Sequence, residues 1–207
     1  MAGRFISFEG TEGSGKSTQI DLTAEWLRSQ GHEVITLREP GGTPIGEETR
    51  HLLKSSDANH NMTPEAELLL MNASRAQLVR EVIQPALEAG KAVLCDRFHD
   101  STTVYQGYGR GLDLAAVKSV IDFAVGDCRP QLTLLLRISV DVSEARRAER
   151  GATERDRFEE AERDFFERVD RGYTELAKQE PDRVKLVDAT QSVDDVQHAI
   201  RGWIGQI

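Results

Sequence analysis

Short apolar runs recur along the chain, separated by polar segments and bounded by turn-forming residues. The runs are continuous rather than alternating, which is typical of strands buried on both faces of a parallel sheet. They cover residues 4–8, 34–37, 92–95, 132–138 and 184–187. The pattern therefore predicts a parallel sheet whose strands are all covered on both faces.

The segments between these runs carry apolar positions at helical spacing. Residues 18–30 form one such segment, and residues 64–89 form another, which Pro85 is expected to kink or split. Asp113 is placed to cap a further helix. Strands that alternate with helices predict βαβ units with right-handed crossovers. We therefore expect an α/β fold with a doubly wound parallel sheet, in a single domain covering residues 1–207.

Composition narrows the class of protein. A chain of 207 residues with 39% hydrophobic residues can bury one core. The net charge of −9 argues against a nucleic-acid-binding surface, although it is compatible with a local basic pocket. We find no apolar stretch long enough to cross a membrane, and we expect no signal peptide. Cys95 and Cys128 have no metal-ligand spacing, so both are expected to be reduced thiols in a cytoplasmic protein.

The segment Gly10–Ser17, which reads GTEGSGKS, fits the P-loop pattern G-x-x-x-x-G-K-[ST] and lies between a predicted strand and a predicted helix. Its glycines let backbone N–H groups turn towards phosphate oxygens, and the following helix N-terminus adds positive charge. Lys16 is expected to reach the outer phosphates and Ser17 to ligate magnesium. The residues expected to bind the nucleotide are Gly10, Thr11, Glu12, Gly13, Ser14, Gly15, Lys16, Ser17 and Thr18. The sequence thus predicts a site for a nucleoside triphosphate.

A second group of polar residues follows the strand predicted at 92–95. Asp96 and Arg97 stand at its carboxyl end, where open α/β sheets place their ligands. A carboxylate there can hold magnesium or its water, and a guanidinium can bind an acceptor phosphate through two N–H groups. We therefore interpret Lys16, Asp96 and Arg97 as catalytic residues, with Ser17 and Asp96 as the magnesium ligands.

Residues 144–171 differ from the rest, with eight arginines and ten carboxylates. The later half carries Phe165, Phe166, Val169 and Tyr173 at helix spacing, so we expect an amphipathic helix there. For the earlier half, a solvated helical face and an arginine-bearing lid are both compatible with the pattern. A lid over about residues 144–158 would exclude water and neutralise charge during phosphoryl transfer.

The motifs together resemble those of the thymidylate kinase family. The run from Asp96 to Gly107 reads DRFHDSTTVYQG and has the family's Asp-Arg-Phe, Ser and Tyr-Gln-Gly at the family's spacing. Further matches are the Phe-Glu before the P-loop, REPGGTP at 38–44, SRAQ at 74–77, DRFE at 156–159 and DAT at 188–190. The resemblance covers essentially the whole chain. It implies a P-loop nucleoside monophosphate kinase fold, and transfer of the γ-phosphoryl group of ATP to thymidylate with Mg²⁺ as cofactor.

This implied reaction needs no general base. The attacking group is a phosphate oxygen, and the second pKa of a phosphate monoester is about 6, so it is largely ionised at neutral pH. Positioning and charge neutralisation should then provide the catalysis.

The resemblance also implies roles for individual residues. Arg97 would bind the acceptor phosphate with help from Arg50 and from Glu39, which would act through magnesium or water. Arg75 would donate to a thymine carbonyl, and Ser101 or Thr102 would contact the adjacent base edge. Tyr105 and Gln106 would line the sugar pocket, where Tyr105 disfavours a ribose 2′-hydroxyl, and Glu12 would be free to bond the sugar 3′-hydroxyl.

The P-loop has no arginine, so the chain resembles the bacterial subtype whose catalytic arginine comes from the lid. Arg150, which precedes Gly151, is the first candidate and Arg157 the second, while Arg147 and Arg155 are expected to be surface charges. The family's members are commonly homodimers, so the resemblance also implies a homodimer.

Two positions depart from the family. Met71 stands where the family usually has the phenylalanine that stacks on thymine, and packing in the helix core explains a methionine there equally well. Arg137 ends the run at 132–138, where relatives often have aspartate or asparagine, and it requires a carboxylate or solvent.

Two other functions stay open at this point. One is a kinase for another pyrimidine monophosphate such as deoxyuridylate, because thymine's methyl group is recognised by pocket shape. The other is a nucleotide-binding regulatory protein without turnover, although such a protein has no need of Lys16, Asp96, Arg97 and the lid arginines together. A GTPase is disfavoured because no Asn-Lys-x-Asp motif occurs.

Overall fold

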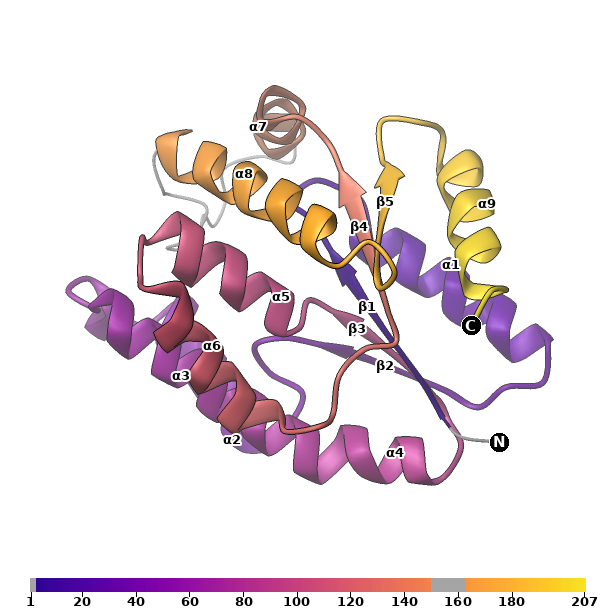
Figure 1. The fold of residues 1–207 in the computed structure, drawn as a ribbon, viewed down its shortest axis with the longest axis horizontal. Helices are drawn as coiled ribbons and strands as arrows, with labels where there is room; N and C mark the ends of the chain where they lie inside the picture. The colour runs from indigo at the N-terminus through magenta and orange to yellow at the C-terminus, as the bar shows by residue number, and fades with distance from the viewer. Residues whose placement is uncertain (1–2, 150–162) are drawn as a thin grey trace.

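The parallel sheet predicted from the sequence is present in the computed structural model, which describes residues 3–149 and 163–207, the Arg147 side chain excepted. Within these residues five strands lie in the order β2-β3-β1-β4-β5, and every pairing is parallel (Figure 1). The strands are β1 (Arg4–Glu9), β2 (Val34–Arg38), β3 (Ala92–Asp96), β4 (Leu132–Arg137) and β5 (Val184–Asp188).

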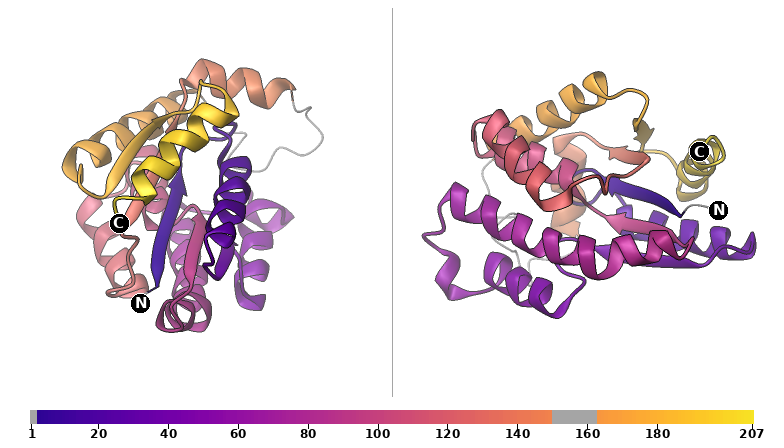
Figure 2. Two further views of the ribbon diagram at one scale, coloured as in Figure 1. Left: turned by 90° about the vertical axis from the view of Figure 1, so that its right-hand side faces the viewer. Right: turned by 60° about the horizontal axis from the view of Figure 1, so that its bottom comes forward.

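Helices cover both faces of the sheet (Figures 1 and 2). On one face α1 (Lys16–Ser29) and α9 (Val193–Ile204) pack against apolar side chains of β1, β3 and β4. On the other face, α3 (Pro64–Leu78), α4 (Gln84–Glu88) and α6 (Leu114–Val125) form a second core with β1 and β3. Beside them, α8 (Arg163–Gln179) forms a third core with β4 and β5. The doubly wound fold is thus confirmed.

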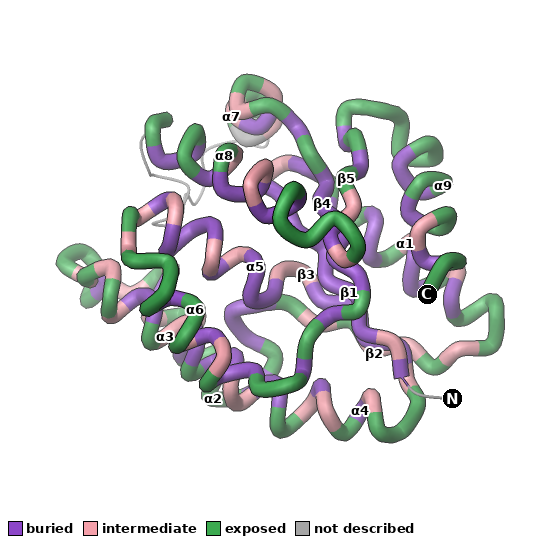
Figure 3. The backbone as a smooth tube through the Cα atoms, viewed as in Figure 1, coloured by how far each residue is buried: buried purple, intermediate pink, exposed green. Residues whose placement is uncertain are grey.

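One expectation about the strands is wrong. The pattern predicted that all of them are buried on both faces, but β2 is intermediate or exposed throughout and β5 is exposed at Leu186 and Asp188. Both are edge strands, so each has a strand neighbour on one side only and less helix above it. The central strands β1, β3 and β4 are largely buried, as Figure 3 shows.

The helix predicted over residues 64–89 is divided into three pieces. A π-helical segment, Val79–Ile83, separates α3 from α4, and Pro85 lies in the first turn of α4. A proline is tolerated there because its missing N–H would have no partner within the helix. The predicted cap of α6 is confirmed, since the Ala116 N–H donates to Asp113 Oδ1 at 2.8 Å.

The charged region forms two helices within the described residues. α7 (Val140–Glu149) contains the first six residues of the expected lid, and residues 150–158 lie outside the described residues. The predicted amphipathic helix is α8, whose apolar side chains pack against Leu135 and Val184. Asp170 of α8 supplies the partner for Arg137, at 3.1 Å. No described helix has both the length and the apolar character needed to cross a membrane.

The remaining short elements lie around the carboxyl ends of the strands. They are α2 (Pro44–Lys54), the 3-10 turn η1 (Asp57–Asn59), α5 (His99–Thr102) and the π-helical segment η3 (Thr103–Gly109). In the sheet register, Asp96 at the end of β3 lies between Phe8 of β1 and Arg38 of β2. The segments that follow these three strands therefore meet at one edge of the sheet.

Candidate functional site

The P-loop connects β1 directly to α1 and depends on glycine at two positions. Gly10 has a φ of 135°, and a Cβ at this residue would lie 2.3 Å from the carbonyl oxygen of Leu136 in β4. Gly15 precedes α1 with a φ of 87°, in the left-handed region. Only glycine adopts these conformations without steric cost, so the loop can follow β4 closely and present backbone N–H groups at the helix N-terminus.

Lys16 lies within the loop and is almost fully buried. Its Nζ donates to the carbonyl oxygens of Gly10 at 3.0 Å and Thr11 at 3.1 Å. Burial, followed by the charge of Arg97, lowers the pKa of Lys16 to about 8, although Asp96 and Glu12 oppose this shift. An anion bound at the loop would favour the charged form of this lysine.

Ser17 and Asp96 come together although they are far apart in sequence. The Ser17 hydroxyl donates to Asp96 Oδ2 at 3.3 Å. A hydroxyl and a carboxylate are oxygen donors of the kind that Mg²⁺ prefers, so the two residues fit a magnesium site that phosphate oxygens and waters would complete. Among the described residues there is no group of three or more His, Cys, Asp or Glu side chains that could hold a metal by itself.

A cleft of about 750 Å³ opens above the P-loop. Among the described residues six cationic and four anionic side chains line it, so their summed charge is positive although the whole chain carries −9. Besides Gly13, Gly15 and Thr18, the lining residues are Glu12, Lys16, Ser17, Arg38, Glu39, Arg50, Lys54, Asp96, Arg97, Arg146 and Glu149. A positive cleft beside a P-loop suits a polyphosphate.

A narrower pocket adjoins this cleft, because Glu12, Glu39, Lys54 and Arg97 line both. Its other lining residues are Pro40, Met71, Arg75, Ser101, Thr102, Tyr105 and Gln106. Every substrate-binding residue predicted from the sequence therefore lines one of the two spaces, with Arg50 in the cleft only. The cleft and the pocket are called the donor cleft and the acceptor pocket below.

Arg97 stands at the junction of the donor cleft and the acceptor pocket. Its Nη2 donates to Glu12 Oε1 at 2.7 Å, and its guanidinium lies 4.9 Å from the centre of the Tyr105 ring. The Tyr105 hydroxyl donates to Glu12 Oε2 at 3.1 Å. Burial alone would raise the pKa of Glu12, but Arg97 and Lys16 lower it below its usual value. The Glu12 carboxylate thus already accepts hydrogen bonds from Arg97 and Tyr105. Two carboxylate oxygens offer about four acceptor positions, so its bond to a sugar hydroxyl stays a prediction.

Arg75 is fully buried and forms a network at the floor of the acceptor pocket. It donates to Glu39, Asn72, Thr102 and the carbonyl oxygen of Phe98 at distances of 2.8 to 3.2 Å, and Nη2 lies 2.7 Å from Glu39 Oε2. Its N–H groups are thus engaged within the protein, so binding of a thymine carbonyl stays a prediction that requires the carbonyl to replace one of the present acceptors.

Glu39 is the partner of Arg75 and is itself buried. Burial raises the pKa of Glu39 to about 7, although Arg75 lowers it. Within the described residues its Oε1 atom has no hydrogen-bond partner. The Glu39 carboxyl group therefore changes charge near neutral pH and has one oxygen available.

Met71 and Gln106 both line the acceptor pocket. Met71 packs against the core of α8 and η3 and also lines the pocket, so its contact with a base stays a prediction. Gln106 Nε2 donates to Glu67 Oε1 at 2.8 Å, and Arg110 donates to both oxygens of the same carboxylate. The fully buried Glu67 thus holds the part of η3 that faces the pocket.

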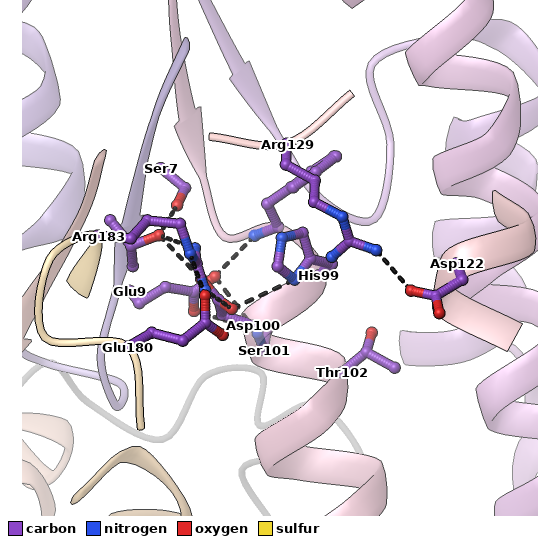
Figure 4. A network of polar contacts seen from close by, with 12 residues as sticks. Ser7, Glu9, His99, Asp100, Ser101, Thr102, Asp122, Arg129, Glu180 and Arg183 are labelled. Atoms are coloured by element: carbon purple, nitrogen blue, oxygen red, sulfur yellow. Dashed lines mark hydrogen bonds and ion pairs between the residues drawn. The ribbon is translucent and has the colours of Figure 1, made fainter. Parts of the chain in front are cut away.

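A buried ion pair anchors α5 beside the acceptor pocket (Figure 4). Arg183, from the turn before β5, donates to both oxygens of Asp100 at 2.7 and 2.8 Å. Thr133 of β4 also donates to Asp100 at 2.8 Å, and its hydroxyl is hydrogen-bonded to that of Ser7 of β1. Burial would raise the pKa of Asp100, but His99 and Arg183 hold it well below its usual value. Neither member of the pair lines the donor cleft or the acceptor pocket.

Several lining residues were missed from the sequence: Arg38, Pro40, Lys54, Arg146 and Glu149. Arg146 donates to the carbonyl oxygens of Gly13 and Ala189, which ties α7 to the P-loop and to the loop after β5. Arg38 and Pro40 belong to the REPGGTP motif, which marked the segment but not the part these residues play. Lys54, Arg146 and Glu149 lie on α2 and α7, where charged side chains are common, so no local signal distinguishes them. Arg150 and Arg157, the predicted lid arginines, lie outside the described residues.

Comparison with known proteins gives a consistent result. The family model described as thymidylate kinase matches residues 8–200. The chain is 52% identical to the thymidylate kinase of Syntrophotalea carbinolica over 204 residues, which cover 97% of this chain and 93% of that protein. It is 49% identical to the thymidylate kinase of Geotalea uraniireducens over 203 residues, with 96% and 94% covered. The crystal structure of thymidylate kinase from Ehrlichia chaffeensis matches with a TM-score of 0.79 and 31% identity over 99% of both chains.

Proposed function

This chain belongs to the thymidylate kinase family and transfers the γ-phosphoryl group of ATP to thymidylate, and we propose that its donor cleft and acceptor pocket divide this reaction between them. ATP binds in the donor cleft with its phosphates on the P-loop, and thymidylate binds in the acceptor pocket. The observation that carries this assignment is that both spaces share Arg97 and Glu12 at their junction. The reacting phosphates of the two nucleotides then meet there.

The transfer depends on charge placement rather than on proton removal. Lys16 and the backbone N–H groups of the P-loop hold the donor phosphates, and Arg97 holds the acceptor phosphate and offsets its charge. Ser17 and Asp96 would hold Mg²⁺, which when bound neutralises phosphate charge and orients the donor. The acceptor oxygen is ionised at neutral pH, so no side chain of the chain has to remove a proton.

Selection of the acceptor base rests on the acceptor pocket. Ser101, Thr102 and Arg75 supply polar groups, and Met71 supplies an apolar surface. Tyr105 is fixed by its hydrogen bond to Glu12, so its ring closes the sugar side of the pocket. A pocket with a rigid tyrosine at this point favours a deoxyribose over a ribose.

For the transition state we propose Arg150 as the arginine that neutralises charge, with Arg157 as the second candidate. Both belong to the segment that connects α7 to α8, and Arg146 already ties α7 to the P-loop. Arg150→Ala should lower kcat far more than the KM for thymidylate, since it removes an interaction made in the transition state. An unchanged kcat would assign the role to Arg157 or to another residue.

The test of the proposed function is acceptor-dependent release of ADP from ATP. Thymidylate, deoxyuridylate, uridylate and cytidylate are supplied separately, each with and without magnesium. Magnesium-dependent turnover with strong preference for thymidylate is the expected result. Turnover with another monophosphate would keep the phosphotransferase chemistry and change the base assignment, and ATP binding without turnover would contradict the function.

We also propose a homodimer in the cytoplasm. Leu69 of α3 and Phe123 of α6, which lie on two packed helices, are 58% and 87% exposed. Large apolar side chains exposed to this degree suit contact with a second copy. ATP as donor and two free buried cysteines suit the cytoplasm. Light scattering of the wild type and of Phe123→Glu tests the dimer, which the substitution should weaken.

A further inference from the structure

The backbone at Arg97 is strained, and neighbouring groups hold it in place. Arg97 has a φ of 69°, and among the described residues it is the one non-glycine residue with a positive φ. Such a conformation persists when surrounding contacts determine it, and it is often found at functional sites. The Arg97 N–H donates to the Phe8 carbonyl oxygen at 2.9 Å, and the Cys95 thiol donates to the Arg97 carbonyl oxygen at 3.0 Å.

Glu9, the last residue of β1, holds the segment that follows Arg97. Its side chain is fully buried, and both of its oxygens are occupied. Oε1 accepts the backbone N–H groups of Phe98 at 2.8 Å and Ser101 at 3.3 Å. Oε2 accepts the hydroxyl groups of Ser101 at 2.5 Å and Tyr173 at 2.8 Å. One carboxylate thus fixes the bend between β3 and α5, where Figure 4 shows it beside Ser101.

Tyr173 connects this carboxylate to the guanidinium of Arg97. Its hydroxyl donates its single proton to Glu9 and accepts a hydrogen bond from Arg97 Nη1 at 3.3 Å. Tyr173 comes from α8, is 3% exposed, and lines neither the donor cleft nor the acceptor pocket. The hydroxyl therefore bridges the arginine and the carboxylate without reaching a nucleotide.

We propose that Tyr173 and Glu9 are positioning residues that fix the backbone and the guanidinium of Arg97 for the acceptor phosphate. Through them, the affinity for thymidylate depends on α8, a helix that lines neither nucleotide space. Glu12 holds the other end of the guanidinium, so Arg97 is held from two sides. The inference rests on the proposed acceptor role of Arg97.

Tyr173→Phe is the variant that separates this role from packing. The Tyr173 ring belongs to the core with Phe165, Phe166 and Val169, and it lies edge-on to the Tyr105 ring. Phenylalanine keeps that ring and removes only the hydroxyl. Tyr108→Phe is the matched control, because no hydrogen bond of the Tyr108 hydroxyl occurs within the part of the chain that the structure describes.

Steady-state kinetics of the full chain provide the measurement. Tyr173→Phe should raise the KM for thymidylate about tenfold, the factor given by the loss of one hydrogen bond to a charged group. The KM for ATP should stay within about twofold, since the P-loop contacts are unchanged. Thymidine lacks the phosphate, so its inhibition constant should not change. Tyr108→Phe should behave as the wild type.

Two results would overturn the positioning role. One is an unchanged KM for thymidylate in Tyr173→Phe. The other is a parallel change in both KM values together with a lower Tm, which would indicate general loss of structure.

Arg97→Gln distinguishes failure of this inference from failure of the proposed function. If it leaves the KM for thymidylate unchanged, the acceptor role of Arg97 and the positioning role both fail. If it raises that KM while Tyr173→Phe does not, only the positioning role fails. The double variant should show less than the product of the single effects, because both substitutions remove the same contact.

Discussion

The donor cleft and the acceptor pocket are built in different ways. The P-loop side of the donor cleft comes from one continuous segment, Gly10–Thr18, and relies on backbone groups and glycine conformations. Besides Glu12 of the P-loop and Lys54 of α2, the acceptor pocket is assembled from side chains of the loop after β2, α3, the loop after β3, α5 and η3. Tyr173 of α8 also contacts its Arg97. The first is a local structure, whereas the second exists only in the complete fold.

This difference predicts different consequences of substitution. In the P-loop, a single change removes a group that the reaction itself uses, so it should reduce turnover with little effect on stability. Around the acceptor pocket, many residues are tied into buried polar networks, so a single change should alter stability or thymidylate affinity more than the chemical step. The following experiments test this contrast.

The largest effect is expected for Lys16→Ala. This change removes the cation that holds the outer phosphates, and water cannot replace it in the loop. We expect kcat to fall on the order of 10⁴-fold, which corresponds to about 5 kcal/mol of transition-state stabilisation. The measurement is ADP release with saturating thymidylate, with the exposed Lys118→Ala as control. Near-normal turnover of Lys16→Ala would contradict the P-loop assignment.

The second effect concerns the buried pair of Asp100 and Arg183. Asp100→Asn leaves the Arg183 charge without its main partner, so we expect the free energy of unfolding to fall by about 3 kcal/mol. Denaturant unfolding measures this loss. Asp122→Asn is the matched control, since Asp122 also pairs with an arginine, Arg129, but both side chains are 41% exposed. Equal losses in the two variants would show that burial does not increase the contribution of the Asp100–Arg183 pair to stability.

The third effect is a pH dependence caused by Glu39. Its pKa is raised to about 7 in the folded state, above the ordinary value of 4.5, so between these values the folded chain binds a proton that the unfolded chain has released. The contribution of Glu39 to stability is therefore present at low pH and is lost as pH rises towards 7. Relative to Glu39→Gln, the wild type should lose on the order of 2 kcal/mol of unfolding free energy between about pH 5.5 and 8. Parallel curves for the two proteins would exclude the raised pKa.

The smallest effect is expected for Met71→Phe. A phenylalanine at this position of the pocket wall offers a flat surface to the base, so the KM for thymidylate should fall about threefold. Thermal unfolding of the same variant provides the second readout. A changed Tm with an unchanged KM would assign Met71 to the core formed by α8 and η3.

The sequence predicted the two spaces unequally well. Local patterns of adjacent residues were enough to predict the P-loop with Lys16 and Ser17. The same holds for Asp96 and Arg97, which directly follow an apolar run. The resemblance to the family then supplied the predicted residues of the acceptor pocket. Neither revealed that Arg75 and Glu12 are already bonded within the protein, because those partners come from distant segments and are set by packing.

The same reason explains the other misses. The edge position of β2 and β5 depends on strand order, which the hydrophobic pattern of a single strand does not contain. Lys54 and Arg146 belong to helices with many charged residues, and only the fold brings them to the donor cleft. Tyr173 was predicted as part of an apolar helix face. The role of its hydroxyl depends on hydrogen bonds to Glu9 and Arg97, which come from the first half of the chain.

The hydrogen bond between Tyr173 and Glu9 also constrains the order in which the molecule can be completed. Its two partners are 164 residues apart. During synthesis, β1, the P-loop and α1 leave the ribosome early and can come together through short-range contacts, whereas the residue that fixes Arg97 is added close to the end. Closing so long a loop is entropically costly until the intervening helices have packed. The capacity to hold ATP phosphates can therefore arise in a partial chain, but an ordered thymidylate site belongs only to the finished one.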